Sequence, residues 1–536
     1  MSRDRHDSAQ RGRASRSSIG LVALALVAGC GGRDADLDAA FEASDAVGLK
    51  RAVAIGDGEQ NRVVLITSGS PEELTITPLA VGENRIAMLP SVDGDRLLVL
   101  STGERPRRNA DDELPSLTLI DASAGAAPSV AARYPLPDAF STLTLDPAGR
   151  WVVLSGAGDN FVSNPNQLVL VDLADPDFEP ITKTIRSFGA APERFQFTAP
   201  LDVPGGAERR FLIVESRKDI TLVDLGDPER PEITVPLPRT PTGADGRPLQ
   251  VVVHPGEPDV VEDAQLAVRL ENDPNLVLIN FIPSEDASLA FRLTPNLVDV
   301  GGPPAAFDFV TTDGGRRLAA VVPARNEANL VHPRTTGVEH VALPARFDQF
   351  RRVTEGALAD QPGDVALLWS PTTSMVGFWS LGRTSNQAFR SVDTVNLETN
   401  VNQLFDVPGT ALGHRKLLQS PDNRFYVLDL RSRQSFPMFA SGRNLSLRVA
   451  PDGLRAWAFA AGSPLLAKVD LETLEPTSLE IERGIRQLFD IETESGDGRV
   501  LVALHEGGGR GATVLDATNP DTADSRFFPG LLLRER

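Results

Sequence analysis

The sequence is short of cysteine and histidine, the side chains on which thiol and zinc chemistry depend. Its 536 residues include one cysteine, Cys30, and six histidines. Because no cysteine follows Cys30, the domain beyond it has no disulfide and no thiolate metal site. Its stability must come from a hydrophobic core, which 41% hydrophobic residues can supply in a chain of this length.

The common catalytic motifs are also missing from the sequence. It contains no HExxH motif and no Gly-x-Ser-x-Gly elbow, and the glycine-rich stretch from His505 to Leu515 lacks the Gly-Lys-Ser/Thr end of a phosphate loop. The short Asp-Gly segments lack the spaced acidic ligands of a calcium loop. No cofactor is implied. Structural or surface roles are expected for the histidines at His254, His332, His340, His414 and His505.

Positive charge is scarce in the body of the chain. There are 53 lysines and arginines against 73 acidic residues, which gives a formal net charge of −20. Nucleic acids bind to basic surfaces, where phosphate neutralisation releases counterions. The acidic balance and the lack of a basic cluster therefore predict no nucleic-acid partner.

No hydrophobic run is long enough to span a membrane. The longest near the N-terminus, Ile19 to Ala28, covers about half of a ~30 Å hydrocarbon core as a helix. Five arginines precede it, which is the arrangement of a secretory signal peptide. Residues 1–29 are therefore predicted to be a leader outside the fold.

Small residues lead directly into the cysteine at the end of this run. Val27, Ala28 and Gly29 precede Cys30, and this pattern resembles the lipobox of bacterial lipoproteins. The resemblance implies cleavage between Gly29 and Cys30, lipidation of the cysteine, and a membrane anchor in the bacterial cell envelope. The alternative is an unmodified cysteine in an ordinary signal peptide. In lipoproteins of this kind, an aspartate directly after the lipidated cysteine tends to retain the protein at the inner membrane. This chain has Gly31 at that position, so the resemblance favours the outer membrane, on either its periplasmic or its surface face.

Two further segments follow the leader. Residues 30–49 are acidic and poor in large apolar side chains, which predicts a flexible tether with a short helical turn near Leu37 to Ala43. Residues 50–536 are assigned to one folded domain.

That domain repeats a pattern of short strands and turns. The clearest copies are "TLTLDPAGRWVVLSG" with "QLVLVDL", and "SLRVAPDGLRAWAFAAG" with "LLAKVDL". Asp, Pro and Gly favour tight turns, so Asp146 to Gly149 and Pro451 to Gly453 are predicted hairpin tips. In one copy we expect strands at Thr142–Leu145, Trp151–Ser155, Leu168–Asp172 and Ile181–Ile185. Trp151 and Trp457 occupy matching positions, which favours packing between repeats; Trp369 and Trp379 are expected in the core.

The spacing of the repeats predicts the fold class. An Asp-Leu or an equivalent recurs at a step of about fifty residues, which is typical of propeller blades. We therefore predict an all-β chain that forms a β-propeller of four-stranded antiparallel blades, with eight to ten units and seven as the lower alternative. One ring is favoured over two in tandem. The turns resemble those of TolB-like and YVTN-type repeats; the Gly-His and Trp-Asp pair of WD40 blades is missing. The marker positions are Asp121, Asp172, Asp224, Asn280, His332, Asp429, Asp470 and Asp516.

A second repeat singles out three carboxylates. "NQLFD" ends at Asp406, "RQLFD" ends at Asp490, and the looser "AAFDF" contains Asp308. Each falls where the innermost strand of a blade is expected. One hypothesis is that they line the channel and hold a divalent cation or a basic partner. The alternative is that each satisfies local backbone donors and sets the register between blades.

Three functions are compatible with these features. The leading hypothesis is a monomeric, lipid-anchored module that binds a protein or a polysaccharide, or acts as a scaffold. The second is a propeller hydrolase or lactonase with a divalent metal in the channel. The third is a structural part of outer-membrane assembly. Fold alone does not choose among them.

Overall fold

The computed structural model describes residues 43–528 apart from short segments at 59, 106–107, 157–161, 188–189, 206, 240–242, 244–245, 257–262, 286–290, 354–363, 383–391, 410, 423, 439–444, 506–510 and 521–524. The described residues form 42 strands and no helix, so none of them supplies a helix that could cross a membrane. The predicted all-β class is confirmed.

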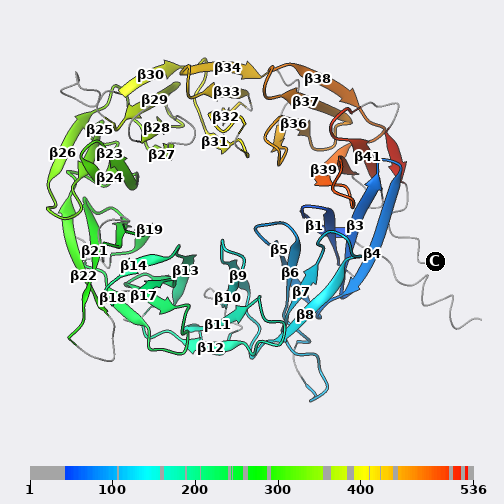
Figure 1. Ribbon diagram of the computed structural model, residues 1–536, viewed down its shortest axis with the longest axis horizontal. Helices are drawn as coiled ribbons and strands as arrows, with labels where there is room; N and C mark the ends of the chain where they lie inside the picture. The colour runs from blue at the N-terminus through cyan, green and yellow to red at the C-terminus, as the bar shows by residue number, and fades with distance from the viewer. Residues whose placement is uncertain are drawn as a thin grey trace, which may run out of the picture.

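Ten four-stranded antiparallel sheets stand around one ring as the blades of a propeller (Figure 1). Each blade uses one continuous stretch of chain. First strands such as β19, β27 and β31 face the central opening, and fourth strands such as β22, β30 and β34 form the rim (Figure 1). The single ring is confirmed, and the number of blades is at the upper end of the predicted range.

The strand bounds of blades 1 to 5 are as follows: β1 (Ala43–Gly48), β2 (Ala52–Asp57), β3 (Arg62–Ser70) and β4 (Glu73–Ala80); β5 (Arg85–Pro90), β6 (Arg96–Ser101), β7 (Ser116–Asp121) and β8 (Ser129–Pro135); β9 (Thr142–Leu145), β10 (Trp151–Ser155), β11 (Gln167–Asp172) and β12 (Ile181–Thr184); β13 (Pro192–Phe197), β16 (Phe211–Ser216), β17 (Asp219–Asp224) and β18 (Ile233–Pro236); β19 (Pro248–His254), β20 (Gln265–Leu270), β21 (Asn275–Pro283) and β22 (Phe291–Asp299). A separate hairpin, β14 (Leu201–Val203) with β15 (Ala207–Arg209), is inserted in blade 4.

Blades 6 to 10 continue in the same order: β23 (Ala306–Thr312), β24 (Gly315–Val322), β25 (Glu327–Val331) and β26 (Val338–Ala342); β27 (Gln349–Val353), β28 (Val365–Trp369), β29 (Met375–Ser380) and β30 (Val392–Asn396); β31 (Gln403–Asp406), β32 (Arg415–Gln419), β33 (Phe425–Asp429) and β34 (Gln434–Met438); β35 (Leu445–Val449), β36 (Arg455–Ala460), β37 (Leu465–Asp470) and β38 (Pro476–Glu480); β39 (Ile485–Glu492), β40 (Arg499–His505), β41 (Ala512–Asp516) and β42 (Arg526–Phe528).

The turn between β9 and β10 shows how the sequence specifies a hairpin. The backbone N–H of Gly149 donates to the carbonyl of Asp146 at 2.7 Å, and the Asp146 carboxylate accepts from the N–H of Ala148 at 3.0 Å. Gly149 has φ of 72°, a conformation that a side chain disfavours. The predicted strands on both sides of this turn are confirmed.

The aspartates that mark the repeat end the third strand of a blade. Asp172 accepts from the N–H of Ala174 at 3.0 Å, and Asp516 accepts from the N–H of Thr518 at 2.6 Å. Such a carboxylate satisfies donors of the turn that leads into the fourth strand. Its recurrence therefore reflects turn chemistry.

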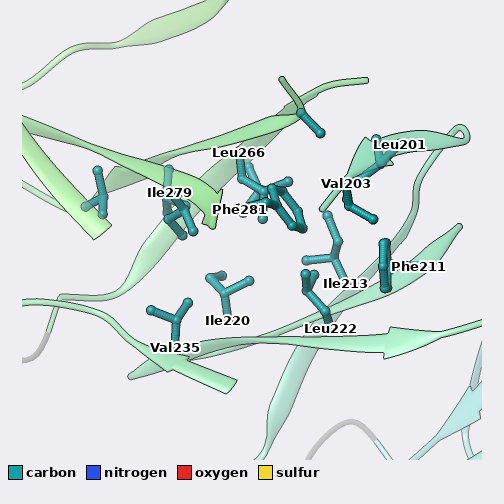
Figure 2. Close-up of a cluster of buried hydrophobic side chains, with 14 of the residues drawn as sticks. Leu201, Val203, Phe211, Ile213, Ile220, Leu222, Val235, Leu266, Ile279 and Phe281 are labelled. Atoms are coloured by element: carbon teal, nitrogen blue, oxygen red, sulfur yellow. The ribbon is translucent and has the colours of Figure 1, made fainter. Parts of the chain in front are cut away.

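The core lies between neighbouring blades. In one cluster, Phe211 and Ile213 of blade 4 meet Leu266 and Phe281 of blade 5, and the inserted hairpin contributes Leu201 (Figure 2). Second and third strands are buried on both faces, which explains their continuous apolar runs. Full burial of one such aliphatic side chain contributes about 1.5–3 kcal/mol.

All four tryptophans belong to these clusters. Trp151 packs between blades 3 and 4, and Trp457 between blades 9 and 10, so the predicted packing between repeats is confirmed. Trp369 and Trp379 are buried at the two sides of blade 7, as predicted.

The ring closes through contacts between blade 10 and blade 1. The N–H of Glu492 donates to the carbonyl of Lys50 at 2.8 Å, and the N–H of Glu494 donates to the carbonyl of Ser68 at 2.9 Å. Val53 and Ile55 share an apolar cluster with Val502. Within the part of the chain that the structure describes, both blades keep all four of their own strands, so side-chain packing and these backbone hydrogen bonds close the ring without a shared blade.

The propeller starts earlier in the sequence than expected. The sequence predicts a tether over residues 30–49, but Ala43–Gly48 forms β1, the innermost strand of blade 1. An innermost strand faces the opening and needs few large apolar side chains, so its sequence resembles that of a linker. Leu37 and the rest of the predicted helical turn up to residue 42 lie outside the described residues.

Two turn glycines provide a matched test of backbone packing. Gly149 and Gly453 have φ of 72° and 71°, but a Cβ on Gly149 would meet nothing within 4 Å, whereas one on Gly453 would lie 1.9 Å from the Pro408 carbonyl. We expect Gly149→Ala to cost about 1–2 kcal/mol from its left-handed backbone conformation. Gly453→Ala should lower the thermal unfolding midpoint considerably more; equal midpoints for the two variants would contradict this.

Candidate functional site

The three predicted aspartates lie on the innermost strands of three different blades. Asp308 is in β23, Asp406 ends β31 and Asp490 is in β39, with one blade between each successive pair. Among the residues that the structure describes, no group of three or more His, Cys, Asp or Glu side chains is arranged to hold a metal ion. A cation role for these aspartates stays a prediction.

Asp406 is held by two cations. Its carboxylate lies 2.8 Å from Lys416 Nζ in its own blade and 2.8 Å from Arg351 Nη1 in blade 7. Partial burial opposes ionisation, but the hydrogen bonds and charges of these two partners hold the pKa of Asp406 below its usual range. The carboxylate therefore links two neighbouring blades.

Asp490 makes the same kind of link. It lies 2.7 Å from Arg499 Nε in its own blade, and Trp457 Nε1 in blade 9 donates to it at 3.2 Å.

Asp308 accepts from the N–H of Phe309 at 2.8 Å. Burial raises the pKa of Asp308, and the nearby Arg352 guanidinium opposes part of that rise.

Other polar side chains near the opening also donate to the backbone of an adjacent blade. Arg194 donates to the Pro248 carbonyl at 2.7 Å, Gln250 to the Phe307 carbonyl at 3.1 Å, and Arg352 to the Phe309 carbonyl at 3.1 Å. None of the sequence motifs described above includes these residues. Polar residues alternate with apolar ones along the first strands, and this alternation is the sequence signal that could have identified them.

A group of charged side chains lines a pocket between blades 5 and 6. This arginine pocket has a volume of about 170 Å³. Arg316 at the start of β24 forms an ion pair with the Asp263 carboxylate, and both side chains are about 95% buried. Arg334 binds the other oxygen of Asp263 at 2.9 Å. The lining residues are Asp263, Gly314, Gly315, Arg316, Arg317, His332, Pro333 and Arg334.

His254 supports the inner side of this pocket. Its Nδ1 lies 2.6 Å from Arg316 Nη1 and 3.1 Å from the N–H of Gly256, so Nδ1 is an acceptor. Burial, together with the Arg316 charge, lowers the pKa of His254 to about 4. His254 is therefore neutral at pH 7, with its proton on Nε2.

His332 orders the opposite side of the pocket. It stands at the position where most blades carry the turn aspartate, and its Nδ1 accepts from the N–H groups of Arg334 at 3.2 Å and Thr335 at 3.3 Å. Burial and the Arg317 charge lower the pKa of His332. A neutral imidazole thus replaces a carboxylate and leaves the pocket with less negative charge than the same turn in other blades.

The inserted hairpin of blade 4 supports the chain on which Asp263 lies. The N–H of Asp202 in β14 donates to the Pro255 carbonyl at 2.8 Å, and the N–H of Ala264 donates to the Asp202 carbonyl at 3.1 Å. These bonds anchor the residues on both sides of segment 257–262 to blade 4. The hairpin interrupts the repeat, and the sequence analysis did not predict it.

A larger cavity of about 450 Å³ lies beside the ring closure. Arg51 lines it and is paired with Asp95 at 2.9 Å and with Glu492 at 3.0 Å. Residues of blades 10, 1 and 2 contribute: Arg51, Thr67, Thr75, Ala122, Ser123, Ala124, Gly125, Ala126, Ala127, Pro128, Glu494 and Ser495. Its arginine is balanced by carboxylates, unlike the arginine pocket.

Comparisons with known proteins relate the chain only distantly to others. No family model matches the sequence, and no curated protein matches it. Among solved structures, the dihydro-heme d1 dehydrogenase NirN has 13% identity over 68% of this chain and 71% of its own, with a TM-score of 0.40. Sqt1 of Saccharomyces cerevisiae has 9% identity over 82% and 97%, with a TM-score of 0.38. Streptogramin B lyase has 10% identity over 59% and 89%, with a TM-score of 0.34. We transfer no activity or partner at this distance.

The lowered pKa of His254 predicts a pH dependence of stability. Between about pH 6.5 and about pH 4 the unfolded chain binds a proton that the folded His254 resists, so stability should fall as the pH falls through this window. His254→Asn keeps an acceptor in place of Nδ1 and does not titrate. Thermal midpoints measured from pH 4 to 7 should therefore depend less on pH in the variant; identical pH profiles would contradict the assignment.

Proposed function

We propose that the protein is a lipid-anchored β-propeller of the bacterial cell envelope, held at the outer membrane through Cys30, that binds a protein or glycan partner or acts as a scaffold. The lipobox-like sequence around Cys30 supports the anchor. The observation that carries the binding role is that the chain enters β1 at one face of the ring, whereas the arginine pocket and the cavity beside Arg51 open at the other.

The register of blade 1 defines these faces. Ala43 is paired with Asp57, and Gly48 is paired with Val53. The chain therefore enters β1 at the end of the blade where the second strand turns into the third. Turns from the first strand to the second, and from the third to the fourth, lie at the other end, which we call the turn face.

Both cavities open among residues of the turn face. Gly314 and Gly315 belong to the turn between β23 and β24, and Arg334 follows β25. Ser123 and Gly125 belong to the turn between β7 and β8. Loops on a rigid scaffold commonly carry binding sites.

The point at which the chain enters β1 supports an accessible turn face. Cys30 and Ala43 are separated by thirteen residue steps. A fully extended chain of that length reaches at most about 45 Å. A lipid at Cys30 would attach the ring within this distance of the bilayer through the face opposite the turn face, which carries no attachment.

The anchor is tested by Cys30→Ser. The variant should lose labelling by a fatty-acid probe and should move from the membrane fraction to the soluble fraction, because several acyl chains are needed for stable attachment. Wild-type protein processed in the same cells is the control. Membrane retention of the unlabelled variant would contradict the anchor.

The binding face is tested by photo-crosslinking in intact cells. A crosslinking residue at exposed Ser123 lies on the turn face, whereas one at exposed Asn109, between β6 and β7, lies on the opposite face of the same blade. We expect a discrete crosslinked partner from position 123 and none from position 109. Crosslinks from position 109 alone, or from neither position, would contradict the proposal.

A further inference from the structure

We propose that the arginine pocket between blades 5 and 6 binds an oxyanion group, a phosphate or a carboxylate, carried by the ligand. This inference deepens the proposed function and rests on it only in taking the turn face as the side from which a ligand arrives. The argument depends on the charge, the rigidity and the size of the pocket.

The pocket has an excess of positive charge in an acidic protein. Of the described residues that line it, three are arginines and one, Asp263, is a carboxylate. The neutral imidazoles of His254 and His332 contribute no compensating negative charge. Segment 313–353 contains seven arginines and four acidic residues, although the chain as a whole has a net charge of −20. An anion would balance this local excess.

Arg316 is a fixed donor at the buried side of the pocket. Asp263 and His254 hold its two terminal nitrogens, and its buried Nε has no hydrogen-bond partner. Nη1 also donates to the Asp263 carbonyl at 3.2 Å, so Arg316 holds its place through three protein contacts and contributes mainly a fixed positive charge at the buried side of the pocket. Its charge also acts more strongly there than it would in water.

Arg317 and Arg334 complete the pocket from two turns of blade 6. Arg317 Nη2 lies 3.1 Å from the position that a Cβ on Gly314 would take, so the glycine leaves room for this side chain across the turn. The Arg334 side chain is 55% exposed, and its backbone N–H is fixed by His332. Arg334 shares Asp263 with Arg316, and Arg317 Nη1 donates to the Arg316 carbonyl at 2.7 Å. Three guanidinium groups therefore share one carboxylate among the described lining residues, an arrangement that suits a second oxyanion.

The volume of the pocket limits what can enter. The pocket has a volume of about 170 Å³ and opens to solvent. This space accommodates one oxyanion group. The rest of a larger ligand would lie over the turn face.

The test is calorimetric titration of the full-length protein in detergent with inorganic phosphate or succinate. Chloride at the same ionic strength is the reference. Wild-type protein should bind at least one of the two anions more tightly than chloride. The double variant Arg317→Gln/Arg334→Gln should lose at least tenfold in affinity, while Arg317→Lys/Arg334→Lys should retain more of it, because charge is kept and only the fork is lost.

Arg150→Gln is the matched control. Arg150 lies in the corresponding turn of blade 3, has a side chain that is 58% exposed, and is paired with Asp172 outside the pocket. The Arg150→Gln substitution removes one positive charge from the same face and should leave the affinity for the anion unchanged. Thermal midpoints of all variants confirm folding, and Arg316 is left intact because its ion pair is buried.

The relative affinities for phosphate and succinate identify the chemical group of the ligand. Tighter binding of phosphate assigns a phosphoryl group, and tighter binding of succinate assigns a carboxylate. Wild-type protein that binds neither anion above chloride, or a double glutamine variant that binds as wild type does, would overturn the proposal. Because the titration needs no cells, its failure is distinct from failure of crosslinking at position 123.

Discussion

The fold depends on burial of the second and third strands between neighbouring blades. A single four-stranded sheet with two apolar faces is not stable in water by itself, and no disulfide stabilises this domain. Leu212 and Val214, for example, pack against blade 3 while Ile213 packs toward blade 5. The same packing between Val53 and Val502 closes the ring, so every blade is stabilised by both of its neighbours.

The inner ends of the blades are joined by polar contacts. A first strand has an edge that no further strand covers, so its free backbone groups need other partners. Arg194, Gln250 and Arg352 supply donors to the adjacent blade, while Asp406 and Asp490 accept from side chains of their neighbours. These contacts give the internal repeat "QLFD" a role in the alignment of blades.

The repeat is interrupted in blades 4 and 6. Blade 6 places His332 at a position where other blades have an aspartate, and it places two consecutive arginines after its first turn. Blade 4 adds a hairpin that anchors the chain leading to Asp263. The hairpin also contributes Leu201 and Val203 to the apolar cluster between blades 4 and 5. Together the two interruptions build a rigid cationic pocket on the face opposite the entry of the tether.

The features that the sequence by itself determined are local. Turn chemistry at Asp146 to Gly149 and the apolar runs on both sides predicted the strands of blade 3, because neighbouring residues form them. The leader and its cysteine are likewise read from adjacent residues, as a prediction. Only the tertiary structure decided that the ring has ten blades, that Ala43–Gly48 belongs to it, and that Arg334 meets Asp263 across 71 residues. The curvature that closes a ring and the meeting of distant turns are set by packing between blades, and no local pattern encodes them.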